Sequence, residues 1–163
     1  MMHRPAASPP PGAYLIFRVG QYELALPHAA IRQIAPHPET VQVPAPSPWL
    51  RGLLCGGVLA VPVVDTAMLL GLDAESEHPA VIVVSNPNED AAFPSVGLLV
   101  DRVADTARVA ASEWKPLRPS SALAFRSRVD ACWRGRSRPC YLLRLPALIP
   151  ADLDAQFSPF SLT

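Results

Sequence analysis

The chain has 163 residues, of which 50% are apolar and 17% are charged, and its 14 basic and 14 acidic residues leave no net charge. This length fits one domain or two small subdomains sharing a core, and the apolar content allows a sizeable core. A membrane span is excluded even over the least charged stretch, 53–72. Asp65 lies inside that stretch, and a glycine pair and Pro62 would interrupt a helix there.

The N-terminal stretch 1–13 is rich in proline and serine and offers little to bury, which predicts a disordered arm. It contains no apolar run that could form the core of a signal peptide, so we expect a cytoplasmic protein. In that compartment Cys55, Cys132 and Cys140 should stay reduced. None of them belongs to a CxxC pair, which argues against a metal site or a structural disulfide.

Short apolar runs separated by glycine and proline follow in order along the rest of the chain, and they predict strands. The predicted strands are 14–19, 22–26, 53–55, 58–64, 80–84, 96–100, 103–109, 129–134 and 140–145, with an edge pairing at Val41 and Val43. Short helices are expected at 28–30 after Pro27, and at 66–70, where Asp65 is placed to cap the first turn. Because no long periodic helix is present, the pattern predicts an all-β barrel or sandwich.

Several side chains are assigned to the core or to turns. The aliphatic residues expected in the core are Val61, Val63, Ile82, Val84, Leu98 and Val100. Ile31 and Ile34 follow the first short helix and are also expected to point to a core. Trp133 is expected in the core, whereas Trp49 has two open interpretations, a core residue or an anchor for a partner. Asp101 follows a strand directly and is expected to stabilise a turn.

Nothing in the sequence predicts catalysis, a metal or a bound cofactor. The four histidines are scattered among loops without a spacing suited to zinc, and no phosphate-binding glycine motif is present. A thiol hydrolase would need an imidazole beside Cys132 or Cys140, and neither cysteine has the flanking residues of a known thiol-enzyme family. A thiol enzyme is therefore kept only as the last of the functional hypotheses, and we expect no enzyme activity.

Four segments in series resemble the CheW family of adaptor proteins. They are the opening 14–34 with ALP at 25–27, VPVVD at 61–65 followed by LLGL at 69–72, VGLLVDRV at 96–103, and the final hairpin. Together they cover about residues 14–150. The resemblance implies two small SH3-like five-stranded β-barrel subdomains that share one core, with short helices and no cofactor. It divides the chain into an arm at 1–13, a CheW-like domain at 14–150 and a short tail at 151–163.

The same resemblance implies a non-catalytic adaptor. Such a protein couples a chemoreceptor or a similar sensor to a CheA-type histidine kinase in a chemotaxis or pilus-motility pathway. The implied partners are the kinase, the cytoplasmic tip of the chemoreceptor and other CheW-like domains, with neither nucleic-acid binding nor membrane insertion. The positions that match partner-facing segments of the family are Ile31, Gln33, Ile34, Gly52, Gly57 and Val58. We expect the isoleucines to bury apolar surface and the glycines to allow close backbone approach.

The hairpin before VPVVD departs from the family pattern. The family usually has Asn-Leu-Arg-Gly there, whereas this chain has CGGV at 55–58, so Gly57 occupies the place of the arginine. Gln33 similarly stands where the family tends to have an acid. Because a glycine cannot offer charge-assisted hydrogen bonds, we expect weakened binding to ordinary chemoreceptor tips.

Charge is unevenly distributed along the chain, and this supports a second functional hypothesis, an alternative to the adaptor. The segment 115–144 carries one acid, Asp130, and eight bases: Lys115, Arg118, Arg126, Arg128, Arg134, Arg136, Arg138 and Arg144. The alternative function is a small β-barrel that binds nucleic acid or another polyanion through this segment. An acidic protein partner or a solvated hairpin edge is favoured over it, because few aromatic residues are interleaved and no nucleic-acid motif is present.

Overall fold

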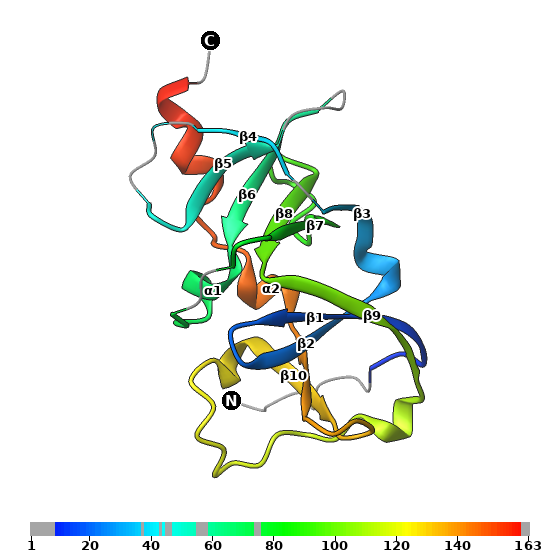
Figure 1. Ribbon diagram of the computed structural model, residues 1–163. Coiled ribbons are helices and arrows are strands. Elements are labelled where there is room, and N and C mark those ends of the chain that lie inside the picture. Colours follow the sequence, from blue (N-terminus) through cyan, green and yellow to red (C-terminus); the bar gives the residue numbers. More distant parts are fainter. Residues whose placement is uncertain are drawn as a thin grey trace.

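Two sheets that pack against each other form the body of the molecule in the computed structural model (Figure 1). The structure describes residues 9–160 apart from 37, 43, 45–46, 55–58 and 74–75, with side chains as far as residue 157. Within these residues the elements are almost all strands, as alternating and β-branched apolar runs bounded by glycine and proline predict. The all-β class is therefore confirmed.

The first sheet has the strand order β10-β11-β2-β1-β9. Its strands are β1 Gly12–Val19, β2 Tyr22–Pro27, β9 Arg102–Val109, β10 Val129–Trp133 and β11 Cys140–Leu143. The pair β11–β2 is parallel, and the other pairs are antiparallel. Beyond β9 the chain curls back toward β10, where Lys115 and Cys132 exchange backbone hydrogen bonds of 2.7 and 2.8 Å.

The second sheet has the strand order β3-β7-β8-β6-β5-β4. Its strands are β3 Ile31–Ala35, β4 Thr40–Val41, β5 Leu50–Leu54, β6 Val61–Asp65, β7 Ala80–Ser85 and β8 Ser95–Val100. Only β6 and β8 pair in parallel among its described pairs. The hydrogen-bonded order thus places β3 at one edge and β4 at the other.

Short helices lie between the strands and after the last one. They are η1 His28–Ala30, α1 Thr66–Leu69, η2 Ala111–Glu113, η3 Arg126–Arg128, α2 Leu145–Leu148 and η4 Asp154–Phe160. The predicted cap of α1 is confirmed, because the Met68 N–H donates to Oδ1 of Asp65 at 3.1 Å. Within the described ranges, no helix has both the length and the apolar character needed to span a bilayer.

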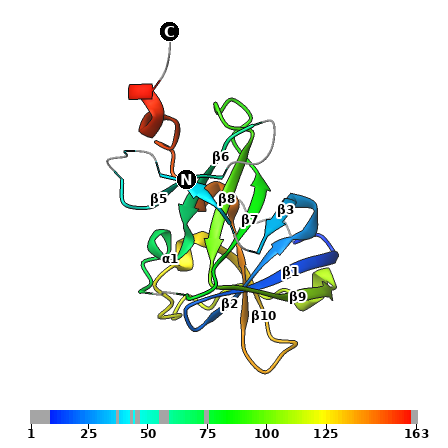
Figure 2. The same cartoon turned by 45° about the horizontal axis from the view of Figure 1, so that its top comes forward.

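The two sheets lie against each other in Figure 2, and the layer of apolar side chains between them belongs to both. Leu15 and Phe17 of β1 pack there in one cluster with Val64 and Leu98 of the second sheet. The first sheet encloses a further cluster that contains Trp133, which is 9% exposed, so its predicted place in the core is confirmed. The second sheet has a smaller cluster of its own, built on Val63, Val81 and Val83. The predicted shared core is therefore present.

The two sheets curl strongly, but they are not the closed five-stranded barrels that were predicted. The second sheet has six strands, and its edges β3 and β4 are not paired with each other in the described part of the chain. The ends of β3 and β5 nevertheless lie near each other, since Ala35 of β3 and Leu54 of β5 pack against the same small cluster. The link 36–39 allows at most roughly 18 Å between the Cα atoms of Ala35 and Thr40.

Two further expectations about the core and the turns have different outcomes. Of the six predicted core aliphatics, Val61 is only partly buried, because it is the first residue of β6 and lies at the end of the sheet; the others are at most 2% exposed. The turn predicted at Asp101 is confirmed. Its Oδ2 accepts the Gly20 N–H at 2.8 Å, and its own N–H donates to the Arg18 carbonyl oxygen at 3.0 Å.

The packed part of the chain extends beyond the predicted 14–150 at both ends. β1 begins at Gly12, which pairs with Val109 of β9. At the other end Leu153 is 3% exposed within the shared core, and the Phe157 ring lies 4.8 Å from the Phe93 ring between centroids. The rest of the predicted arm, 1–8, and of the predicted tail, 161–163, lies outside the described residues.

Candidate protein-binding surfaces

The partner-facing residues predicted from the family pattern lie on β3 and in the β5–β6 hairpin. Gly57 and Val58 lie outside the described residues, so their places in the site stay predictions. Ile31, Gln33 and Ile34 belong to β3, and Gly52 belongs to β5. Ala35 at the end of β3 and Leu54 at the end of β5 pack against the same small cluster, so the ends of these two strands lie near each other.

The two isoleucines of β3 point to the same face of the sheet. Ile31 lies opposite Val84 and Ile34 lies opposite Ile82, with a register shift in between that keeps both on the face of the shared core. Ile31 is partly buried against that core, as predicted. Ile34 is 39% exposed, so its predicted burial is wrong: β3 is an edge strand, and no described strand covers its outer side.

The outer side of β3 is polar except for Ile34. Gln33 is exposed, and Nε of Arg32 donates to the Ser85 hydroxyl at 2.9 Å, which ties the register shift to the end of β7. An edge strand presents free backbone groups, and partners can use them by adding a strand. An isolated exposed isoleucine beside such an edge is suited to protein contact.

Gly52 allows the close approach expected of it, but the approaching backbone is the chain's own. Its φ is +143°, and a Cβ at this position would lie 2.6 Å from the Val41 carbonyl oxygen. A glycine is therefore required for β4 to lie across β5. This packing holds Val41 at the surface, where it is 56% exposed.

Exposed apolar side chains lie on both edge strands of the second sheet and in the turn beside β4. We call them the rim surface, defined by Ile34 on β3, Val41 on β4 and Leu59 in the β5–β6 turn, which are 39%, 56% and 61% exposed. Val41 pairs with Leu53 near the end of β5, and the turn that carries Leu59 follows that end directly. Groups of exposed apolar residues mark interaction sites more often than single ones do. The sequence alone did not identify Val41 or Leu59 as members, because exposure depends on which strand covers them.

Arg51 lies at the centre of a second surface that the sequence did not predict. Two adjoining cavities of about 370 and 460 Å³ share Arg51, Pro79 and Leu99 in their walls. The Arg51 side chain is 52% exposed, and its Nη1 lies 3.5 Å from Oδ2 of Asp65. An ion pair this exposed is weak, so the guanidinium can exchange Asp65 for a partner's carboxylate.

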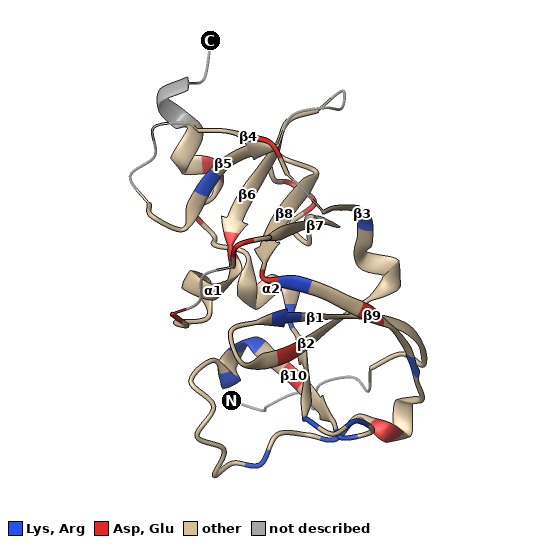
Figure 3. Cartoon of the chain, viewed as in Figure 1, with Lys and Arg blue, Asp and Glu red and all other residues tan. Residues whose placement is uncertain are grey.

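The basic segment 115–144 gathers at the far end of the first sheet (Figure 3). Part of its charge is compensated. Nη2 of Arg136 lies 2.8 and 2.9 Å from the two oxygens of Asp105, and Nε of Arg144 lies 2.7 Å from Oδ1 of Asp130. Four bases are exposed and have side chains with no hydrogen-bond or ion-pair partner in the described residues: Lys115, Arg118, Arg134 and Arg138.

This basic surface lacks the aromatic platform typical of single-strand binding. Phe125 is 2% exposed and Trp133 is 9% exposed, because both pack in the interior. Bases of single-stranded nucleic acid stack on exposed rings in such proteins. The geometry therefore disfavours base stacking, so a polyanion bound at this surface would be held by charge alone.

The two described cysteines are unsuited to nucleophilic catalysis. Cys132 in β10 and Cys140 in β11 are free and buried. Burial raises the pKa of the Cys132 thiol, and burial together with the charge of Glu23 raises the pKa of Cys140 to about 12. Both remain neutral thiols at physiological pH, and the thiolate is the reactive form. Cys55 lies outside the described residues. Across the described ranges, no group of three or more His, Cys, Asp or Glu residues is placed to hold a metal ion.

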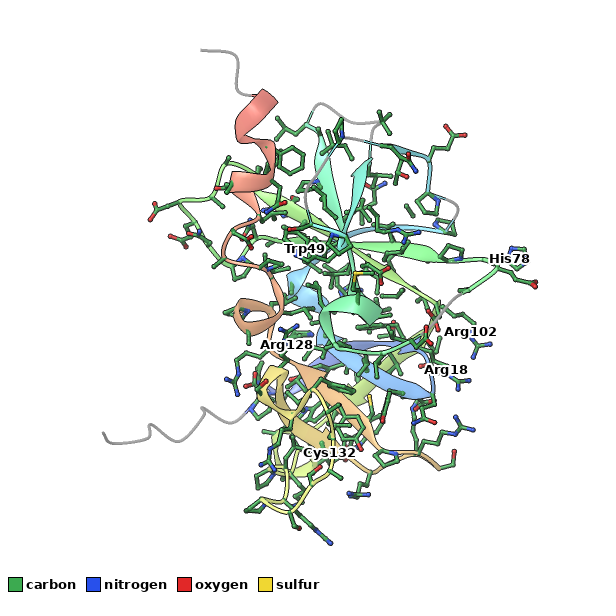
Figure 4. The ribbon with its side chains drawn as sticks, turned by 90° about the vertical axis from the view of Figure 1, so that its left-hand side faces the viewer. Arg18, Trp49, His78, Arg102, Arg128 and Cys132 are labelled. Atoms are coloured by element: carbon green, nitrogen blue, oxygen red, sulfur yellow. The ribbon has the colours of Figure 1, made fainter. Side chains whose placement is uncertain are left out.

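Trp49 is a core residue, which is one of the two interpretations that the sequence left open. It is partly buried against the shared core, and it also lines a cavity of about 520 Å³ together with Met68 and Arg128 (Figure 4). Arg128 is held there by a hydrogen bond to the Leu69 carbonyl oxygen. The indole is therefore a core residue with one accessible side, not a free anchor.

Comparison with known proteins agrees with this architecture. The family model described as the CheW-like domain matches residues 13–152. Among solved structures, the scaffolding protein TtCheW from Thermoanaerobacter tengcongensis superposes with a TM-score of 0.71 and 14% identity, covering 82% of this chain and 88% of that chain. At this identity the likeness shows the fold alone. A search of the curated proteins finds no match.

Proposed function

Because the chain belongs to the family of CheW-like domains, we propose that it is a non-catalytic adaptor that couples a sensor to a CheA-type histidine kinase. The sensor is a chemoreceptor, or a similar protein, of a chemotaxis or pilus-motility pathway. The observation that carries the proposal is the rim surface, which consists of exposed apolar side chains on both edge strands and in the β5–β6 turn of the second sheet.

We assign the rim surface to the regulatory domain of the kinase. Its described members are apolar, and an edge strand lies beside them, so binding there does not depend on the arginine that Gly57 replaces. The Arg51 surface is the candidate for the receptor, since it provides a weakly held guanidinium between two cavities. An adaptor needs two such surfaces to hold two partners at once.

Isothermal titration of the full chain with the purified kinase regulatory domain tests the first assignment. Ile34→Asp and Val41→Asp should each weaken binding at least tenfold, because a charge would be buried in an apolar contact. Met68→Asp is the matched control, since Met68 is 43% exposed but lies on α1. Equal loss from all three variants, or no binding by the unaltered chain, would refute the assignment.

The receptor contact is tested by restoring the missing charge. We expect ordinary receptor tips to bind weakly and Gly57→Arg to bind them about tenfold more tightly, with kinase binding unchanged. Gly57→Gln separates charge from size, and melting curves of both variants check the hairpin. Tight receptor binding by the unaltered chain would show that another group, such as Arg51, already makes this contact.

Polyanion binding is the second candidate function, because four bases of 115–144 are exposed and have no side-chain hydrogen-bond or ion-pair partner in the described residues. Titration with a DNA duplex over a range of salt concentrations separates it from the adaptor. Affinity for a polyanion should fall steeply and linearly on a logarithmic salt scale, whereas binding at the apolar rim should change little. A steep slope with DNA and no kinase binding would favour the second candidate.

A further inference from the structure

Two arginines face each other across the first sheet. Arg18 of β1 and Arg102 of β9 are direct cross-strand partners, and Figure 4 shows them side by side at one edge of the molecule. Like charges placed directly opposite each other destabilise a sheet. Neither guanidinium belongs to an ion pair or donates a side-chain hydrogen bond within the described residues. The fold therefore keeps two like charges opposite each other, with neither guanidinium in an ion pair among the described residues.

Arg18 is the less exposed of the two arginines, and its donor is unsatisfied. The residue is partly buried, and its Nε has almost no solvent exposure and no hydrogen-bond partner. Glu23 lies opposite Arg18 on the other flank, and its Oε2 is likewise buried without a hydrogen-bond partner, but no ion pair joins the two among the described residues. A buried charged donor without a partner is costly unless a ligand supplies the acceptor.

The two arginines line a cavity of about 540 Å³ whose other walls are fixed. The Ser76 hydroxyl donates to the Asp101 carbonyl oxygen at 3.0 Å and accepts the His78 N–H at 3.2 Å. The Asp101 carboxylate is already engaged by the Gly20 N–H, so it is oriented toward the turn. His78 also lines the cavity, and Glu77 is an exposed acid at the same cavity.

We propose that Arg18 and Arg102 form an oxyanion site that takes a carboxylate or a phosphoryl group. Guanidinium groups bind both by paired, charge-assisted hydrogen bonds, and two of them on adjacent strands can clamp one anion from two directions. The bound anion would relieve the repulsion between the arginines. The site lies on the first sheet, and it does not depend on the rim surface.

Titration of the full chain at low ionic strength tests the site, with inorganic phosphate in one arm and an acetylated diglutamate peptide in the other. Nitrogen-15 NMR of the arginine Nε–Hε groups gives the readout. We expect saturable shifts of the Arg18 and Arg102 signals in at least one arm, and the arm that saturates identifies the source of the anion. Shifts that stay linear with concentration in both arms would overturn the proposal.

Variants separate this site from general attraction to a basic surface. Arg18→Gln and Arg102→Gln should each weaken the titration about tenfold, while Arg118→Gln, an exposed base elsewhere, should leave it unchanged. Without anion, Arg102→Gln should raise the melting temperature by about 1 °C, because one of two opposed charges is removed. Equal weakening by Arg118→Gln, or a lower melting temperature for Arg102→Gln, would overturn the proposal.

Discussion

At the scale of single residues, two glycines with nearly the same backbone angle allow a controlled test of the β4–β5 contact. Gly12 has φ +146° and open space where a Cβ would stand, whereas Gly52 has φ +143° and the Val41 carbonyl oxygen at 2.6 Å. Both substitutions by alanine carry the same backbone strain, about 1–3 kcal/mol. Only Gly52→Ala must also push β4 away from β5.

We therefore expect Gly52→Ala to lower the free energy of unfolding by clearly more than Gly12→Ala does. Urea denaturation of the two variants and the unaltered chain measures the difference. Gly52→Ala should also weaken kinase binding, because Val41 belongs to the rim surface. Equal stability of the two variants would show that β4 can move away from β5 at no cost.

The buried thiols give a prediction about reactivity and about pH. Since the folded pKa of Cys140 is raised to about 12, above its unfolded value, its burial stabilises the fold below about pH 9 and this contribution is lost as pH rises toward 12. Iodoacetamide at pH 8 should leave Cys132 and Cys140 unmodified in the folded chain and label both in urea. Peptide mapping reads each cysteine separately. Rapid labelling of either in the folded state would contradict the burial.

At the scale of elements, α1 depends on a capping residue that also forms an ion pair. Asp65 accepts the Met68 N–H and lies 3.5 Å from Arg51. Asp65→Ala should lower the free energy of unfolding by about 1 kcal/mol, mostly through loss of the cap. Asp65→Asn keeps an acceptor and removes only the charge, so it should cost less, since the ion pair is exposed. Thermal denaturation measures both, and equal losses would show that the ion pair dominates.

The strands differ in how well their sequences predict them, and the reasons are local. β7 and β8 were predicted within one residue at each end, because a continuous β-branched run suits a strand buried on both faces. β3 was not predicted as a strand. Its two isoleucines stand three residues apart, as on a helix, and the register shift of β3 lets a strand place both on one face. Such an irregularity leaves no signal in the hydrophobic pattern.

The candidate surfaces were predictable only in part. The positions on β3 and β5 came from the resemblance, and their burial could not be deduced, since Ile34 is exposed only because β3 is an edge strand. The opposition of Arg18 and Arg102 depends on the register of strands more than eighty residues apart in the chain. Register between distant strands is set by the whole hydrophobic pattern and by the turns, so single residues do not reveal it.

At the scale of the whole molecule, the C-terminal segment connects the two sheets. After β11 of the first sheet, the chain passes through α2, places Leu153 in the shared core and sets Phe157 against Phe93 in the β7–β8 turn (Figure 1). The predicted domain, 14–150, would lack both contacts. The segment is therefore part of the folded unit and not an independent tail.

We expect truncation after residue 150 to destabilise the protein by several kcal/mol. Burial of Leu153 contributes about 1.5–3 kcal/mol, and the aromatic pair contributes about 0.5–1.5 kcal/mol more. Leu153→Ala and Phe157→Ala in the full chain divide this loss between the two contacts. Deletion of residues 1–8 is the matched control at the other end, where the proline-rich sequence predicts no large change. Urea denaturation measures all four variants. If truncation left the unfolding midpoint unchanged, the domain would end at residue 150 as the sequence predicted, and the two sheets would be held by the shared core alone.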